Sequence, residues 1–298
     1  MPQTVKTPRF WMNELEFLNF NNYSIGQYGY NVVNNTLPVN TSELTLTTFQ
    51  DKSLFDLNLP YVLNNPYLAI LGHEGLTSVD IADAQILNTG VQINASDGAY
   101  KKGWSLMELT GNPTQIAVNT TAKIGSLFVG SYFDVPHSAD LALTLTHDYS
   151  GVKKTITRGG STLVNTQYHK NPKWGTLGAW EIERQNTDTN LSRSGRRIWD
   201  LSFSYLSDAN IHPDTLNLTN MNDFSSSDGI DGGLNTGTDF YGQVIQRAAN
   251  AIPFIFSPDN TSTALDNFYI CMFDQQNFSF SQTAPNLYSI KLRIMEVW

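Results

Sequence analysis

The sequence predicts a mainly β protein, with a jelly-roll-like β-sandwich followed by further strands and one short helix. Short segments of alternating apolar residues, separated by turn residues, recur between residues 41 and 206, which is the pattern of all-β domains. Residues 239–250 instead space their apolar side chains as an amphipathic helix does. The closing segment, 287–296, alternates as a strand with one solvent-exposed face does. At 298 residues the chain can form one large domain or two ordinary ones.

The N-terminal region, residues 1–40, begins with the run PRFWMNELEFLNF. We expect this run to be a strand or a short helix that packs four apolar side chains, those of Trp11, Leu15, Phe17 and Leu18. The polar, Asn-rich stretch that follows it is expected to be an extended loop.

Residues 41–135 are predicted to form the β-sandwich. The strand candidates are SELTLTTF, PYLAILGHEG, WSLMELTG, TQIAVNTT and AKIGSLFVGSYF. The run VDIADAQILN could be a helix, but strand alternation fits it nearly as well. Many short strands without long helical segments favour two packed sheets of the jelly-roll type.

Residues 136–298 continue with the strand candidates LALTLTHDYSG, VKKTITRGG and STLVNTQY. The segment RRIWDLSFSYLSD is predicted to be an amphipathic strand with an apolar face made of Trp199, Leu201, Phe203 and Tyr205. Residues 207–238 have almost no periodic apolar content and are predicted to be one long loop, which in a compact domain is usually functional or mobile.

The segment from residue 239 to the C-terminus forms one local unit. Its predicted helix, 239–250, carries an apolar stripe of Phe240, Val244, Ile245 and Ala248. Pro253 should end the helix, and Phe254 and Phe256 should share one face of the next strand. Strands NFYICMF, SFSFSQ and LYSIKLRIMEVW follow, and Trp298 is expected to be a packed anchor.

Charge is unevenly distributed along the chain. The net charge is −9, which argues against a nucleic-acid-binding surface over the molecule as a whole. Residues 151–200 nevertheless hold nine Lys or Arg against four Asp or Glu, between two acidic segments. This pattern fits a solvated face, an intramolecular contact, or a self-complementary contact between copies. The interface candidates are Lys153, Lys154, Arg158, Arg193, Arg196, Arg197, Asp228, Asp231 and Trp298.

The single cysteine, Cys271, excludes an internal disulfide and is expected to be a small buried apolar residue. No apolar run is long enough to span a membrane, and the N-terminus lacks the apolar core of a signal peptide. We therefore expect a protein that is made and used without secretion or membrane insertion.

Catalytic motifs are scarce. His73 precedes Glu74 and His147 precedes Asp148, so either histidine could be a base with its orienting carboxylate, although hydrogen bonding at a strand end is commoner. No metal-binding spacing, P-loop, dinucleotide fingerprint or nucleophile elbow occurs. We expect no enzyme activity, no cofactor and no metal, and instead a structural or binding role.

Two other classes of function compete with a structural role. Glu181 and Glu183 share one face of a predicted strand, whereas glycosidase acids normally come from separate elements, so a hydrolase is disfavoured. A carbohydrate-binding module would use aromatic side chains of the sandwich, and Tyr100 and Trp104 are the candidate glycan contacts.

Several motifs resemble bacteriophage tail proteins. The runs PYLAILGHEGL (66–76) and KIGSLFVGSYFDVPHSADL (123–141) are similar to strands that bracket the inserted discoidin-like β-sandwich of tail hub proteins. The Arg158-Gly159-Gly160 turn, the P-F-x-x-x-P-D run from Pro253 and the final E-V-W resemble the tail-tube-like β-barrel of distal tail proteins. The resemblance spans roughly residues 60–298, and His73-Glu74 departs from the usual His-Asn.

This resemblance implies a tail-tube-like β-barrel over residues 136–298, with residues 1–40 as its N-terminal arm and first strand. It implies a virion protein of the tail, assembled in the host cytoplasm into a ring of six copies that joins the tail tube to the baseplate or tip. The expected partners are other copies, the tube, the tip or baseplate hub and fibres, with DNA only in transit. A host glycan is a further possible partner of the sandwich. A host-adhesion module and a head or collar protein are the alternatives.

Overall fold

The computed structural model describes fourteen stretches of the chain: residues 6–22, 47–48, 54–58, 63–73, 80–82, 85–86, 103–110, 115–119, 123–124, 126–148, 154–164, 196–211, 239–262 and 267–297. The protein is mainly β, as predicted, and its pairings are antiparallel. None of the helices in these stretches is long and apolar enough to cross a membrane.

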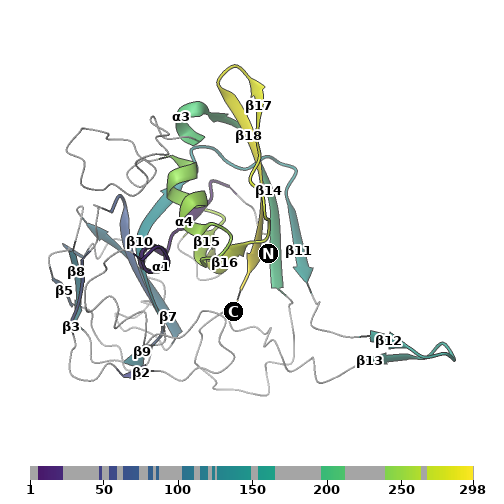
Figure 1. Cartoon of the computed structure of the whole chain (residues 1–298), viewed down its shortest axis with the longest axis horizontal. Helices are drawn as coiled ribbons and strands as arrows, with labels where there is room; N and C mark the ends of the chain where they lie inside the picture. Colours follow the sequence, from purple (N-terminus) through teal and green to yellow (C-terminus); the bar gives the residue numbers. More distant parts are fainter. Residues whose placement is uncertain are drawn as a thin grey trace.

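An 11-stranded sheet forms the body of the molecule (Figure 1). Its hydrogen-bonded order is β11-β14-β18-β16-β15-β1-β10-β4-β7-β6, and β17 also pairs with β18. The strands are β1 (Arg9–Trp11), β4 (Pro66–His73), β6 (Gln85–Ile86), β7 (Gly103–Thr110), β10 (Ser126–Asp134), β11 (Thr144–Asp148), β14 (Arg196–Ser207), β15 (Phe254–Ser257), β16 (Tyr269–Phe273), β17 (Phe280–Ala284) and β18 (Leu287–Glu296).

Three smaller sheets accompany it. They are β3 (Leu54–Asn58) with β8 (Gln115–Asn119) and β5 (Asp80–Ala82), then β2 (Thr47–Thr48) with β9 (Lys123–Ile124), and β12 (Lys154–Ile156) with β13 (Thr162–Val164). The run VDIADAQILN contributes β5 and β6, so its interpretation as strand is confirmed.

The described helices are α1 (Glu14–Phe20), α3 (Asp208–Ile211), the π-helix η3 (Tyr241–Ile245) and α4 (Gln246–Ala248). The side chain of Asn13 caps α1 by accepting from the backbone N–H of Glu16. The predicted apolar stripe of η3–α4 is buried, and Ala249 ends the helix in the left-handed conformation, four residues before Pro253. Helix α3 occupies the start of the predicted loop 207–238, of which residues 212–238 lie outside the described stretches.

Two apolar cores lie on opposite faces of β1. Phe10 packs with Phe254, Phe256 and Phe240 in the first core, whereas Trp11 packs with Tyr67 and others in the second. The four apolar side chains predicted from PRFWMNELEFLNF are all buried, and so is Cys271. Because β1 is covered on both faces, its successive residues Phe10 and Trp11 are both apolar and buried, and no alternation is seen.

Three of the four positions predicted for the apolar face of β14 are confirmed. Trp199, Leu201 and Phe203 are buried, but Tyr205 is 70% exposed, so its placement on the apolar face is wrong. The register with β18 shifts between Phe203 and Leu206, which is a β-bulge, and Leu206 takes the inward position instead. Tyr205 has φ +90°, a strained backbone conformation that costs of the order of 1–3 kcal/mol.

The boundary predicted at residue 135 falls directly after β10. Strand β10 pairs with β4 along one edge and with β1 along the other, so the same sheet runs from the 41–135 segment into the C-terminal strands. At Gly130 the strand passes close beneath the start of α1, where an added Cβ would lie 2.0 Å from the carbonyl oxygen of Met12.

Candidate assembly site

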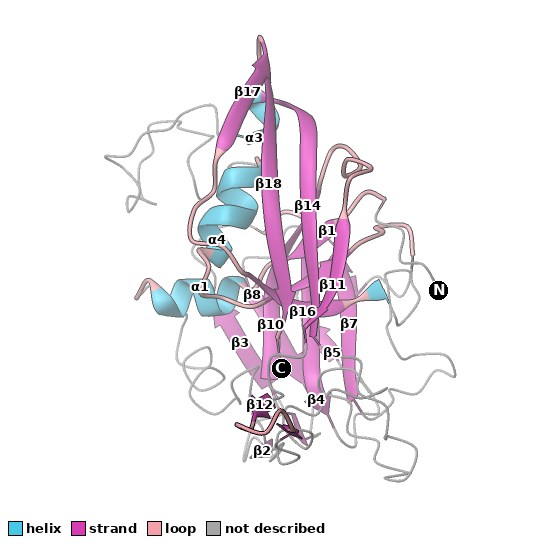
Figure 2. Cartoon of the chain, turned by 90° about the vertical axis from the view of Figure 1, so that its right-hand side faces the viewer, coloured by secondary structure: helices cyan, strands magenta, loops and turns pink. Residues whose placement is uncertain are grey.

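Two edge strands, β11 and β17, flank the long strands β14 and β18 on opposite sides. Strands β14 and β18 are the two longest described strands, with 12 and 10 residues, and Figure 2 shows them running side by side down from the top of the molecule. Strand β11 pairs with β14, and β17 pairs with β18 at the opposite side. Within the described stretches neither β11 nor β17 has a second strand beside it. Each therefore presents unpaired backbone N–H and C=O groups.

The two edge strands differ in how well they are protected against pairing with a strand of another chain. Strand β17, with the sequence FSQTA, contains no charged residue and no proline, the two devices that usually protect an exposed edge. Strand β11 ends in His147 and Asp148, opposite Arg197 and Arg196 of β14. An unprotected edge such as β17 is suited to accept a strand from another chain.

A hairpin of β12 and β13 stands apart from the body at the lower right of Figure 1. Its turn is built by Thr157, whose N–H donates to the carbonyl of Ser161 and whose carbonyl accepts from the N–H of Gly160. The Thr157 hydroxyl also accepts from the Ser161 N–H at 3.0 Å. Gly160 has φ +84°, which explains the glycine of the predicted Arg-Gly-Gly turn.

The hairpin exposes apolar side chains to solvent. Ile156 is 73% exposed, Leu163 58% and Val164 40%. The register pairs Lys154 with Val164, so these two share a face with Ile156, whereas Leu163 lies on the other face. An isolated two-stranded hairpin is marginally stable in water, so a covering surface would stabilise this one. The sequence alone did not mark these apolar residues as exposed; the signals near them were the glycine turn and the basic residues Lys154 and Arg158.

Four of the predicted interface residues can be located. Lys154 and Arg158 are exposed on the hairpin, whereas Arg196 and Arg197 are partly buried at the start of β14. The structure therefore divides the basic segment into a solvent-facing pair and a pair at the sheet.

Arg197 makes an intramolecular contact. Its Nη2 and Nε donate to Glu296 at 2.6 and 2.9 Å, and its guanidinium lies 4.1 Å from the ring centroid of Tyr269. Burial alone would lower the pKa of Arg197, but the hydrogen bonds and charge of Glu296 outweigh it and raise that pKa. This ion pair joins the ends of β14 and β18 beneath the first core.

Other predicted residues lie outside the described part of the chain. They are Lys153, Arg193, Asp228, Asp231 and Trp298, together with Tyr100 of the glycan pair. Trp104 belongs to β7, where it pairs with Leu71, and its side chain is likewise outside the described part. The carboxylates Glu181 and Glu183 also fall there.

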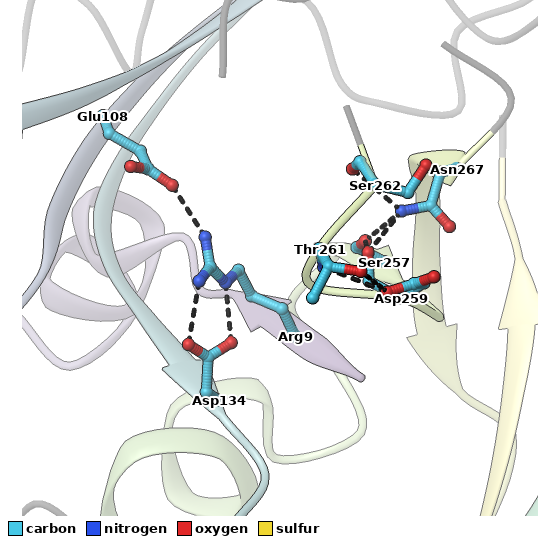
Figure 3. A network of polar contacts seen from close by, with 8 residues as sticks. All are labelled: Arg9, Glu108, Asp134, Ser257, Asp259, Thr261, Ser262 and Asn267. Carbon is cyan, nitrogen blue, oxygen red and sulfur yellow. Dashed lines mark hydrogen bonds and ion pairs between the residues drawn. The ribbon is translucent and has the colours of Figure 1, made fainter. Parts of the chain in front are cut away.

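Arg9 joins the two halves of the sheet (Figure 3). Its Nε and Nη2 donate to the two oxygens of Asp134 at 2.6 and 2.8 Å, and its Nη1 donates to Glu108 of β7 at 2.7 Å. The guanidinium also lies over the rings of Trp11 and Tyr132. All three nitrogens of the guanidinium are engaged by carboxylates of this chain, so this cluster is structural support.

A second polar network closes the turn after β15 (Figure 3). The amide of Asn267 donates to the hydroxyl of Ser257 at 2.6 Å and to the carbonyl of Asp259 at 2.7 Å. The carboxylate of Asp259 accepts from Thr261 and pairs with Lys6 at 2.8 Å. Burial opposes ionisation of Asp259, but Lys6 and Thr261 outweigh it and lower the pKa of Asp259.

The described residues contain no group of three or more His, Cys, Asp or Glu that could hold a metal ion. Among the open features of the described stretches, the edges of β11 and β17 beside the long strands and the exposed β12–β13 hairpin are the candidates for contact with a partner. No family model, curated protein or solved structure matches this chain.

Proposed function

We propose that this protein is a structural component of a phage tail, in which copies assemble side by side into a ring at the end of the tail tube. The ring joins the tube to the baseplate or tip and surrounds the channel through which DNA passes. In this proposal the chain has no enzymatic role, and its partners are further copies of itself and the neighbouring tail proteins.

The observation that carries the proposal is the pair of open edges on the β11-β14-β18-β17 layer. One edge of a copy can pair with the opposite edge of the next, which is a head-to-tail contact. Such contacts generate a closed ring when the rotation between neighbours divides a full turn. Six copies are the number that the resemblance to distal tail proteins implies.

The two parts of the fold take different roles in this proposal. The strands around the first core, with α1 and η3–α4, act as the hub, and the hub completes its tail-tube-like barrel within the ring. The segment 41–135 acts as a jelly-roll-like or discoidin-like sandwich; its strands β4 and β7 belong to the 11-stranded sheet, and β3-β8-β5 is a separate sheet. It sits outside the hub and offers a surface to other tail proteins.

The charge of the chain is compatible with DNA in transit. A ring of copies that each carry a net charge of −9 repels phosphate groups overall. A channel that bound DNA through many Lys and Arg contacts would instead retain it.

The test is the oligomeric state of the purified full-length protein, measured by native mass spectrometry and by negative-stain microscopy, alone and with tail tube protein. We expect closed rings, with six copies as the main species. A strict monomer under both conditions would overturn the proposal.

A variant addresses the edge. Ser281→Lys places a charge on β17, and it should shift rings toward monomers because a charged side chain disfavours pairing at an edge. Ser281→Ala is the matched control and should leave the rings intact. Equal assembly of the two variants would argue against pairing through β17.

A further inference from the structure

The bulge in β14 turns an aromatic side chain out of the molecule. Phe203 and Leu206 are both buried, so the two residues between them, Ser204 and Tyr205, lie opposite the single residue Ser289 of β18. Tyr205 holds φ +90° and is 70% exposed, although a regular strand would have buried it with Phe203. A strained residue that presents an aromatic ring to solvent suggests a contact that the isolated chain lacks.

A second exposed apolar residue, Leu141, is held beside this bulge. The preceding residue, Asp140, donates its N–H to the carbonyl of Ser202 at 2.8 Å. Its carboxylate accepts from the hydroxyls of Ser202 and Ser204 at 2.9 and 2.7 Å. These three bonds fix the loop on β14, and Leu141 is nevertheless completely exposed. Leu141 and Tyr205 together form what we name the bulge surface.

The charges of the bulge surface and of the hairpin are opposite. Asp140 adjoins Leu141, and Asp208, exposed at the start of α3, follows Tyr205 by three residues. The described hairpin, residues 154–164, contains Lys154 and Arg158 and no acidic residue. Both surfaces therefore combine exposed apolar side chains with charges that complement each other.

The two surfaces lie at opposite ends of the long strands. Asp148, six residues before the hairpin, pairs with Arg196 at the first residue of β14. Tyr205 lies nine residues further along β14, which corresponds to roughly 30 Å of strand. In Figure 1 the hairpin is at the lower right, whereas α3, which follows β14 directly, is at the top. Within one chain the hairpin and the bulge surface are thus well separated.

We propose that the bulge surface is the binding site, or seat, for the β12–β13 hairpin of a second copy of this chain. The face of the hairpin with Ile156 and Val164 covers Tyr205 and Leu141, and Lys154 and Arg158 lie near Asp140 and Asp208. This contact rests on the proposed self-assembly and specifies which side chains meet in it: Ile156 and Val164 of one copy, and Tyr205 and Leu141 of the other. It also accounts for the opposite positions of the two surfaces, because a head-to-tail contact joins different patches of identical chains.

Cross-linking between two different variants tests the contact. The Leu141→Cys and Ile156→Cys chains are purified separately and mixed under mild oxidation; Cys271 is buried and serves as the wild-type background. We expect a covalent dimer only in the mixture. Leu163→Cys is the matched control on the other face of the hairpin, and it should give several-fold less dimer with Leu141→Cys.

The outcomes separate this inference from the proposed function. Rings without any cross-link would overturn the seat while the ring stands. A cross-link confined to single chains of the Leu141→Cys/Ile156→Cys double variant would show that a chain seats its own hairpin, which also overturns the inference. A wild-type protein that never assembles would overturn the proposed function and the inference together.

A second variant separates assembly from folding. Tyr205→Gly removes the ring of Tyr205 and relaxes φ +90°, which glycine adopts freely. Its melting temperature should equal or exceed that of the wild type, while half-assembly should require about tenfold more protein, as expected for loss of a central aromatic contact. Phe20→Ser, at an exposed apolar residue at the end of α1, should change neither. Unchanged assembly of Tyr205→Gly would overturn the proposed seat.

Discussion

Arg247 of α4 forms a fully buried ion pair with Glu14, the first residue of α1. The two side chains are 2% and 0% exposed, and the guanidinium also lies over the ring of Phe17. Burial lowers the pKa of Arg247 to about 9, because the charged form loses its hydration. The pair holds α1 and α4 together beside the first core.

Breaking this pair from one side should be strongly destabilising. Arg247→Met leaves the Glu14 carboxylate buried without its cation, and the expected loss is about 3–5 kcal/mol of unfolding free energy. Glu14→Leu combined with Arg247→Met should lose less, because no charge then remains buried. Urea unfolding followed by tryptophan fluorescence measures both. Arg293→Met, at an exposed ion pair, is the control and should lose less than about 1 kcal/mol. A similar small loss for Arg247→Met would contradict the expectation.

Gly130 should tolerate no side chain. The Cβ of Gly130→Ala would lie 2.0 Å from the Met12 carbonyl oxygen and 2.6 Å from Cγ of Glu14, so the backbone at the start of α1 must move. We expect a loss of about 3 kcal/mol by urea unfolding, at the upper end of overpacking effects. Gly159→Ala, in the open turn of the hairpin, should change stability by less than about 0.5 kcal/mol. Equal stability of the two variants would show that α1 is not seated on β10.

The C-terminal unit could be predicted because its signals are local. The stripe of Phe240, Val244 and Ile245 and the alternation of β18 require only the neighbouring sequence. The predicted C-terminal end of the helix, residue 250, was less accurate. Ala249 ends the helix by adopting the left-handed conformation, a position where glycine is usual, so the alanine gave no sequence signal for the end.

The remaining features depend on contacts between distant residues. Tyr205 was assigned to the wrong face because a bulge is a property of the register between β14 and β18, whose paired residues are eighty or more positions apart. Arg197 was selected from local charge, but its partner Glu296 is 99 residues away and became visible only in the fold. Charge density did locate the exposed hairpin, through Lys154 and Arg158.

Arg9 should not be replaceable by lysine. Its planar guanidinium bonds Asp134 through two nitrogens and Glu108 through a third, which a single ammonium group cannot reproduce. We expect Arg9→Lys to lose about 1.5–3 kcal/mol, as for hydrogen bonds to charged groups. Thermal unfolding and urea unfolding should agree on the loss. Lys6→Ala removes an ion pair whose lysine is 59% exposed, and it is the control with an expected loss below about 1 kcal/mol. A loss for Arg9→Lys no larger than the control's would contradict this role.

Glu296 should make stability depend on pH. Burial raises the pKa of Glu296 above its ordinary 4.5, although the hydrogen bonds and charge of Arg197 oppose the shift. Because the folded state then holds the proton more tightly than the unfolded state, this stabilisation is complete below pH 4.5 and is lost as pH rises through the raised pKa. Glu296→Gln cannot titrate. The unfolding free energy of the wild type minus that of the variant should therefore fall as pH rises from 4.5 through the raised pKa of Glu296. Urea unfolding at several pH values measures this difference, and titrating groups that do not interact with Glu296 cancel in the subtraction. A difference that stays constant or rises with pH would show that Arg197 stabilises the charged carboxylate more than burial disfavours it.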